Sequence, residues 1–224
     1  MIHAVIFDMD ETLLDRQSSL RAFAAAQHRA HPDAFSEVPV AHFVERFLAL
    51  DNNGALWKAE VYQQILDENR ITSLEPQTLV DEYIADFHRH CHPFAGLPEM
   101  VDELLADGRQ LGLITNGRYP FQWHNFQSLG VADRFGAVLV SEHEGMRKPN
   151  PEIFRRALSR LDVTAEEAVF VGDNPEADMR GAQSVGMRTI YRPSPFWPEC
   201  AFADAVCTDL RQLPGLVRGF EASR

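Results

Sequence analysis

The sequence has 224 residues, of which 45% are hydrophobic and 24% are charged, and its formal net charge is −12 at pH 7. This length and composition predict one globular domain, or one domain with an insertion. The negative charge argues against nucleic acids and anionic membranes as partners, although a metal ion and a lysine can reverse the field inside one cleft. No apolar run is long enough for a membrane span, and we expect no signal peptide and a cytoplasmic protein.

A short apolar segment near the start, residues 4–7 (AVIF), is predicted to be a buried strand of a parallel sheet. Asp8 and Asp10 follow this strand, and Thr12 comes two residues later. Carboxylates just past a buried strand lie at the carboxyl edge of the sheet, where ligands bind in open α/β folds. The alternative is that both aspartates are solvated turn residues or helix caps, as Asp often is.

Residues 16–92 have a different character from the segments around them. They contain few β-branched runs, and their apolar residues recur at helical spacing in four stretches separated by Pro, Asn and Gly. We therefore expect a four-helix insertion here, in which residues 51–58 (DNNGALWK) are the least helical part. The predicted domains are a core built from residues 1–15 and 93–224 and an inserted helical domain at 16–92.

Strands alternate with helices in the rest of the chain, which predicts an α/β fold with a doubly wound parallel sheet and right-handed crossovers. Glycines after several helical segments fit C-terminal caps. The expected strands after the first are 111–114, 137–140, 168–171, 189–191 and 205–207, and the expected helices are 98–106, 121–129, 152–161, one ending at Val185, and 209–218.

Polar residues follow four of these segments at what should be one edge of the sheet. They lie in DMDET at 8–12, in LITNG at 113–117, at Lys148 in KPNP, and in GDNPEAD at 172–178. In this order, and with a helical insertion after the first motif, the pattern resembles the haloacid dehalogenase superfamily over nearly the whole chain. The resemblance implies a Rossmann-like core and makes the insertion similar to the first class of helical cap domains.

A metal ion is expected from the charges alone. Two like charges about 5 Å apart repel by about 3 kcal/mol at an effective dielectric constant of 20, so several carboxylates around a phosphate need compensating cations. Hard oxygen ligands and a phosphate favour Mg²⁺. The resemblance implies Mg²⁺ held by Asp8, the Asp10 main-chain carbonyl and Asp173, with Asp178 in support.

The resemblance also implies the reaction, the hydrolysis of a small phosphorylated metabolite. Asp8 would attack phosphorus and form an aspartyl-phosphate, and Asp10 would act as general acid and then as general base. Thr115, with the amides of Asn116 and Gly117, would bind the phosphoryl oxygens, and Lys148 would bridge Asp8 and the phosphate.

The sequence leaves three other activities open: a phosphomutase of the same family, a haloacid dehalogenase, and a non-catalytic phosphate-binding module. Asp10 favours phosphoryl chemistry, because the dehalogenase branch lacks an acid at that position. Lys58 has two interpretations, a substrate contact from the cap loop or a residue that packs at a helix start. The run of His88, His90, Cys91 and His92 is expected to be hinge or surface residues rather than a metal site. Nothing in the sequence indicates the substrate or the oligomeric state.

Overall fold

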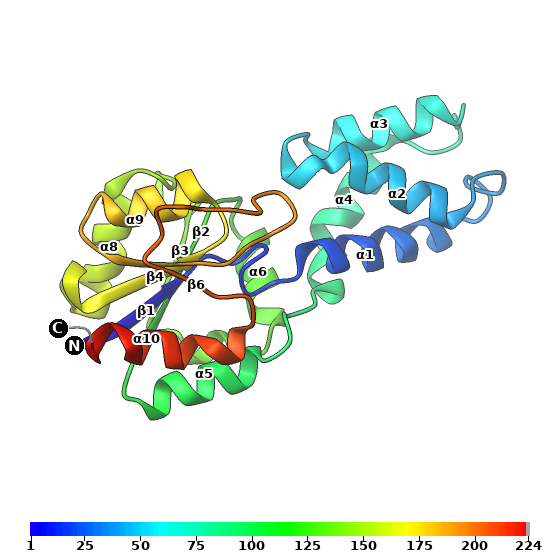
Figure 1. The fold of residues 1–224 in the computed structure, drawn as a ribbon. Helices are drawn as coiled ribbons and strands as arrows, with labels where there is room; N and C mark the ends of the chain where they lie inside the picture. Colours follow the sequence, from blue (N-terminus) through cyan, green and yellow to red (C-terminus); the bar gives the residue numbers. More distant parts are fainter. Residues whose placement is uncertain (223–224) are drawn as a thin grey trace. The chain divides into compact units, whose positions relative to one another are not determined.

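The computed structural model describes residues 1–222 and divides the chain into two compact units (Figure 1). One unit is formed by Met1–Asp15 together with the described part of the segment that begins at Pro93, and the other by Arg16–His92. We call the two parts the sheet unit and the helical unit.

The sheet unit is built on six parallel strands in the order β3-β2-β1-β4-β5-β6, which agrees with the expected doubly wound sheet. The chain runs outward from β1 to β3 and then returns to the other side of β1, so the order reverses between β1 and β4, where such folds bind ligands. The strands are β1 (Ala4–Phe7), β2 (Gln110–Thr115), β3 (Ala137–Val140), β4 (Ala168–Gly172), β5 (Arg188–Tyr191) and β6 (Ala205–Val206).

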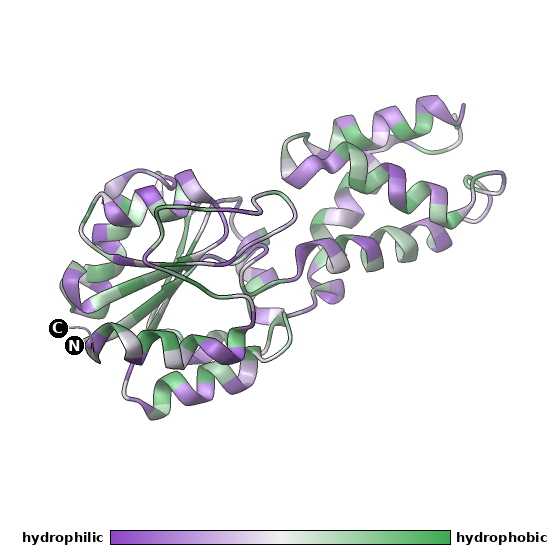
Figure 2. Ribbon diagram, in the orientation of Figure 1, coloured by the Kyte–Doolittle hydropathy of each residue, from purple (hydrophilic) through white to green (hydrophobic). Residues whose placement is uncertain are grey.

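The two central strands, β1 and β4, are buried along their whole length because their sequences, AVIF and AVFVG, carry no polar side chain. Figure 2 shows these strands as the most hydrophobic part of the sheet unit, whereas the helices carry both hydrophobic and hydrophilic residues. Helices α8 (Pro151–Leu161) and α9 (Gly181–Gln183) pack on one face of the sheet, and α5 (Leu97–Ala106) and α10 (Leu213–Ala222) cover the other (Figure 1).

The structure differs from the expected helices in three places. The last helix starts at Leu213 and not at residue 209: Asp209 caps a preceding 3₁₀ turn, Leu210–Gln212, and Pro214 occupies the first turn of α10. A short helix, α7 (Ser141–Glu144), follows β3. The segment Pro175–Arg180 is a π-helical turn that precedes α9. Helix α6 (Phe121–Ser128) is found where it was expected.

The helical unit contains α1 (Arg16–Ala30), α2 (Val40–Asp51), α3 (Lys58–Glu68) and α4 (Pro76–Asp86). Its interior is rich in aromatic rings, and Phe43, Phe47 and Tyr62 are completely buried. Ring centroids of neighbouring aromatic residues, such as Phe35 and Phe43, lie as close as 4.8 Å. None of the helices within residues 1–222 is both long enough and apolar enough to cross a membrane.

Candidate active site

The register of the sheet places Asp8 at the centre of the carboxyl edge. Phe7, the last residue of β1, pairs with Leu113 on β2 and with Val171 on β4. The Asp8 amide extends this pairing by donating a hydrogen bond to the Val171 carbonyl over 2.8 Å. Because all three strands are parallel and in register, the residues that follow β2 and β4 lie beside Asp8.

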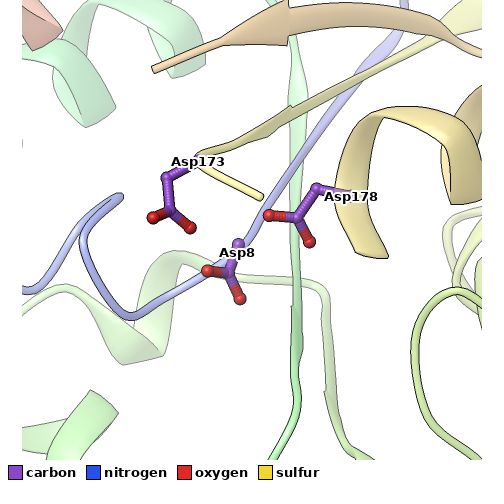
Figure 3. Close-up of side chains that lie close together, drawn as sticks. All are labelled: Asp8, Asp173 and Asp178. Atoms are coloured by element: carbon purple, nitrogen blue, oxygen red, sulfur yellow. The ribbon is translucent and has the colours of Figure 1, made fainter. Parts of the chain in front are cut away.

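Three aspartates converge at this edge (Figure 3). Asp8 follows β1, Asp173 follows β4, and Asp178 comes from the π-helical turn. One carboxylate oxygen from each lies within 4.8 Å of the others, and the residues are only 7%, 5% and 1% exposed. We call these three residues the acidic cluster. All three lie in the first and fourth motifs, whereas the side chain of Asp10, the other residue named as a metal ligand, is not part of the cluster.

Local backbone geometry fixes the Asp178 carboxylate. Its Oδ2 accepts a hydrogen bond from the Asn174 amide at 3.0 Å, and the Asn174 side chain accepts from the amides of Glu176 and Ala177. The Met179 amide donates to the Asn174 carbonyl, a five-residue step that widens the turn. Gly172 is required here because a Cβ at this position would lie 2.4 Å from Asp178 Oδ2.

Lys148 is the cation of the site. Its Nζ lies 2.5 Å from Asp8 Oδ1 and 2.6 Å from Asp178 Oδ1, and the residue is 3% exposed. Burial alone would lower the pKa of Lys148, but Asp178 and Asp8 outweigh it and raise that pKa. The Asn116 side chain holds the lysine in place, donating to the Lys148 carbonyl at 3.0 Å and accepting from its amide at 2.9 Å.

The charges of the acidic cluster are not balanced by one ammonium group. Burial, followed by Asp178 and Asp10, raises the pKa of Asp8 to about 7 against the opposing effect of Lys148. Burial and the neighbouring Asp8 and Asp178 raise the pKa of Asp173 to about 8. Buried carboxylates with raised pKa values favour a further cation, and a set of oxygen donors fits Mg²⁺.

The remaining core residues named from the sequence lie around this cluster. The half-buried Asp10 accepts a hydrogen bond at Oδ2 from Gln122 Nε2 over 2.8 Å, and the same nitrogen lies 3.1 Å from Thr115 Oγ1. The Gly117 amide donates to Ser141 Oγ at 2.9 Å, so in this structure it already has a partner. Whether the Gly117 amide binds a phosphoryl oxygen stays a prediction.

Lys58 lies inside the helical unit. Its ammonium group pairs with Asp51, which also accepts two hydrogen bonds from Arg16 at 2.7 and 3.0 Å. Lys58 Nζ lies 4.9 Å from the ring centroid of Tyr83, and the residue is 3% exposed. These contacts support the packing interpretation, and a substrate contact of Lys58 stays a prediction. We call Arg16, Asp51 and Lys58 the basic cluster.

Sequence reasoning missed two residues that touch the site. Gln122 contacts Asp10, and the Ser194 side chain forms a hydrogen bond with Asp173 that opposes the rise in its pKa. Gln122 lies on a helix and Ser194 in a proline-rich loop, and neither forms part of a recognisable motif. Within residues 1–222, the acidic cluster is the only group of three or more His, Cys, Asp or Glu side chains that could hold a metal ion.

Comparison with known proteins places this geometry in a family. Residues 5–191 match the family described as haloacid dehalogenase-like hydrolase. A glyceraldehyde 3-phosphate phosphatase of Pyrococcus furiosus is 38% identical over 123 residues, which are 53% of this chain. The match spans about half of that relative, 51% of its length.

Two further matches span almost the whole chain. A ribulose-1,5-bisphosphate 5-phosphatase of Halopiger xanaduensis is 31% identical over 221 residues, covering 93% of this chain and 92% of that protein. Among solved structures, a 2-haloacid dehalogenase from Pseudomonas syringae pv. Tomato DC3000 is 30% identical with a TM-score of 0.64, covering 98% of this chain and 100% of that one. The relatives with the same scaffold therefore include both phosphatases and a dehalogenase by name.

Proposed function

The chain belongs to the haloacid dehalogenase-like hydrolases, and from this premise we propose that it is a Mg²⁺-dependent phosphatase of a small phosphomonoester. The observation that carries the proposal is the position of Asp8. It is buried at the carboxyl edge and paired with Lys148, and its carboxylate lies close enough to those of Asp173 and Asp178 for the three to bind one metal ion. A carboxylate in this environment can be both a nucleophile and a metal ligand.

The first step transfers the phosphoryl group to Asp8. An Asp8 carboxylate oxygen attacks phosphorus, the bond from phosphorus to the ester oxygen breaks, and the electron pair leaves with the alcohol. Asp10 donates its proton to that leaving oxygen. Lys148, 2.5 Å from Asp8 Oδ1, stabilises the negative charge on the phosphoryl oxygens, as do Thr115 and the main-chain amides of Asn116 and Gly117.

The second step hydrolyses the aspartyl-phosphate. Asp10, now ionised, accepts a proton from water, the water oxygen attacks phosphorus, and the bond between phosphorus and the Asp8 oxygen breaks. Asp8 returns to a carboxylate and inorganic phosphate leaves. When bound by Asp8, Asp173 and the Asp10 carbonyl, with Asp178 in support, Mg²⁺ would supply positive charge that offsets the carboxylates and the phosphate.

The substrate class we propose is a small phosphorylated metabolite, and the helical unit would act as a cap that restricts its size. The named phosphatase relatives act on phosphorylated metabolites of this kind. We expect a cytosolic enzyme.

A second candidate, hydrolysis of a carbon–halogen bond, rests on the match to the Pseudomonas dehalogenase. The proposed role of Asp10 argues against it, because a halide ion leaves without a proton and needs no general acid at this position. The presence of Asp10 beside the nucleophile is therefore better explained by an alcohol leaving group.

The test is an assay of phosphate release from p-nitrophenyl phosphate and from a panel of sugar phosphates, triose phosphates and phosphoserine. We expect turnover with Mg²⁺ that is lost with EDTA and restored by excess Mg²⁺. Chloride release from 2-chloropropionate without phosphate release would favour the dehalogenase. Formation of an isomeric sugar phosphate without free phosphate would favour a phosphomutase. No turnover of any of these compounds would leave only a binding module.

A further inference from the structure

Gln122 joins two parts of the site through one side-chain amide. Its Nε2 lies 2.8 Å from Asp10 Oδ2, 3.1 Å from Thr115 Oγ1 and 3.4 Å from the Asn116 carbonyl. The residue is 5% exposed, so these contacts are shielded from water. Asp10 belongs to the loop after β1, whereas Thr115 ends β2, and Gln122 on α6 therefore connects that loop with the end of β2.

Neighbouring residues fix the orientation of the Gln122 amide. Its Oε1 accepts a hydrogen bond from Asn125 Nδ2 at 3.2 Å, and Asn125 is 1% exposed. This contact turns the NH₂ group of Gln122 toward Asp10. An ionised carboxylate can only accept hydrogen bonds, so it needs a donor at this position. Gly117 leaves the space: a Cβ there would lie 2.6 Å from Gln122 Cγ. The second motif thus needs glycine in part to accommodate this side chain.

We infer that Gln122 is a positioning residue for the general acid and base of the reaction. The inference rests on the proposed function. By holding Asp10 Oδ2, Gln122 restricts rotation of the carboxyl group and leaves Oδ1 to carry the proton to and from the reacting oxygen. General acid catalysis requires this oxygen to be within hydrogen-bond reach of the leaving group, and small misplacements are costly. Because Gln122 also contacts Thr115, it fixes the position of the Asp10 carboxyl group relative to a residue that is proposed to bind the phosphoryl group.

The inference predicts a dependence on the leaving group that a purely structural role would not produce. p-Nitrophenolate leaves without a proton, whereas the alkoxide of benzyl alcohol needs one. The two phosphate esters, p-nitrophenyl phosphate and benzyl phosphate, are similar in size and shape. The ratio kcat/KM reports events up to transfer of the phosphoryl group to Asp8, so it isolates the step in which Asp10 acts as an acid.

The test compares two variants with the wild type on both esters. Gln122→Met keeps the length of the side chain and removes the hydrogen bonds, and Gln122→Glu keeps its shape and replaces the donor facing Asp10 by an oxygen. In both variants we expect kcat/KM for benzyl phosphate to fall by about 10- to 100-fold, which is less than the full contribution of a general acid because Asp10 is still present. The value of kcat/KM for p-nitrophenyl phosphate should change by less than about threefold. Gln127→Met is the matched control, because Gln127 lies on the exposed side of the same helix, and it should behave like the wild type.

The inference would be overturned if kcat/KM in a folded variant, Gln122→Glu included, fell equally for both esters or did not fall for either. In both cases the ratio of the two kcat/KM values would stay that of the wild type. Thermal unfolding of each variant shows whether it is folded, and Gln122→Glu keeps the test available if Gln122→Met does not fold. Failure of the proposed function is a separate result, since then the wild type itself would release no phosphate from either ester with Mg²⁺.

Discussion

The acidic cluster of the sheet unit and the basic cluster of the helical unit are built from the same kind of buried contact, a lysine paired with an aspartate. In the acidic cluster, Lys148 contacts two of three neighbouring carboxylates, those of Asp8 and Asp178, and the pKa values of Asp8 and Asp173 are raised to about 7 and about 8. In the basic cluster, one carboxylate contacts two cations. Burial would raise the pKa of Asp51, but Arg16 and Lys58 outweigh it and lower this pKa to about 2.

The direction of the pKa shift separates a site that stabilises the fold from one that is available for chemistry. The Asp51 charge is satisfied by Arg16 and Lys58, so the basic cluster holds the ends of α1, α2 and α3 together. The acidic cluster is under-compensated and gains most from an added cation. Four predictions follow from this contrast, in order of decreasing effect.

Removing the nucleophile should affect activity and not stability. Asp8→Asn is expected to lower kcat by about 10⁴-fold or more, because it removes the carboxylate that is proposed to accept the phosphoryl group. Its thermal stability in EDTA should be equal to or above that of the wild type, since a buried carboxylate with a raised pKa is replaced by a neutral group. Steady-state kinetics and thermal unfolding check both parts, and residual activity of more than a few per cent would contradict the assignment.

The matched substitution in the basic cluster should affect stability. Asp51→Asn removes the carboxylate that Arg16 and Lys58 share and leaves both cations buried against a neutral group. Loss of one partner of a buried ion pair costs about 3–5 kcal/mol. Urea unfolding followed by circular dichroism measures the change in the free energy of unfolding. An unchanged midpoint would mean that this cluster does not stabilise the helical unit.

Mg²⁺ should stabilise the wild type and not a variant of the acidic cluster. At a Mg²⁺ concentration 100 times the dissociation constant, the expected stabilisation is about 2.7 kcal/mol, seen as a rise in Tm. Asp173→Asn should reduce this rise, because it removes a proposed ligand. Gly172→Ala should also reduce it, by displacing Asp178. A rise of equal size in all three proteins would place the bound ion elsewhere.

The pH dependence of stability should have opposite signs in the two clusters. The raised pKa values of Asp8 and Asp173 contribute stability that is present below about pH 4 and is lost as the pH rises toward 7–8. The lowered pKa of Asp51 contributes stability that is present above about pH 4 and is lost as the pH falls toward 2, by about 2 kcal/mol. Unfolding against pH tests each assignment: Asp8→Asn should make the loss of stability toward pH 7–8 smaller, because Asp173 still contributes, and Asp51→Asn should remove the loss toward pH 2. A loss of wild-type size toward pH 7–8 in Asp8→Asn, or a loss toward pH 2 that persists in Asp51→Asn, would contradict the assignment.

The sequence was sufficient where a short pattern has one physical solution. The runs AVIF and AVFVG, in a chain where short apolar runs alternate with helical segments, predict buried strands, and aspartates directly after parallel strands are expected at one edge. The proximity of Asp8 and Asp173 therefore follows from the order of the elements. The role of Gly172 could not be predicted from the sequence, because this glycine leaves room for the Asp178 carboxylate, whose position only the structure gives.

Other features depend on partners distant in sequence. Lys58 looks like a loop residue until Asp51 and Arg16 are seen around it, and a lysine has no periodicity that would show its burial. The role of the Gln122 amide depends on its hydrogen bond to Asp10, which lies 112 residues away in the sequence. Asn174 caps the π-helical turn, and its amide fixes the Asp178 carboxylate. The sequence shows no signal for this turn beyond the spacing of the fourth motif.

The most direct test of the account is to trap the covalent intermediate. The wild-type enzyme is mixed with a turned-over phosphomonoester and Mg²⁺, quenched in acid within milliseconds and reduced with borohydride, which converts an acyl-phosphate into an alcohol. Peptide mass spectrometry should then find homoserine at position 8, and none at that position when substrate is omitted. Turnover without reduction at position 8, or with reduction at another aspartate, would contradict the proposal that Asp8 accepts the phosphoryl group.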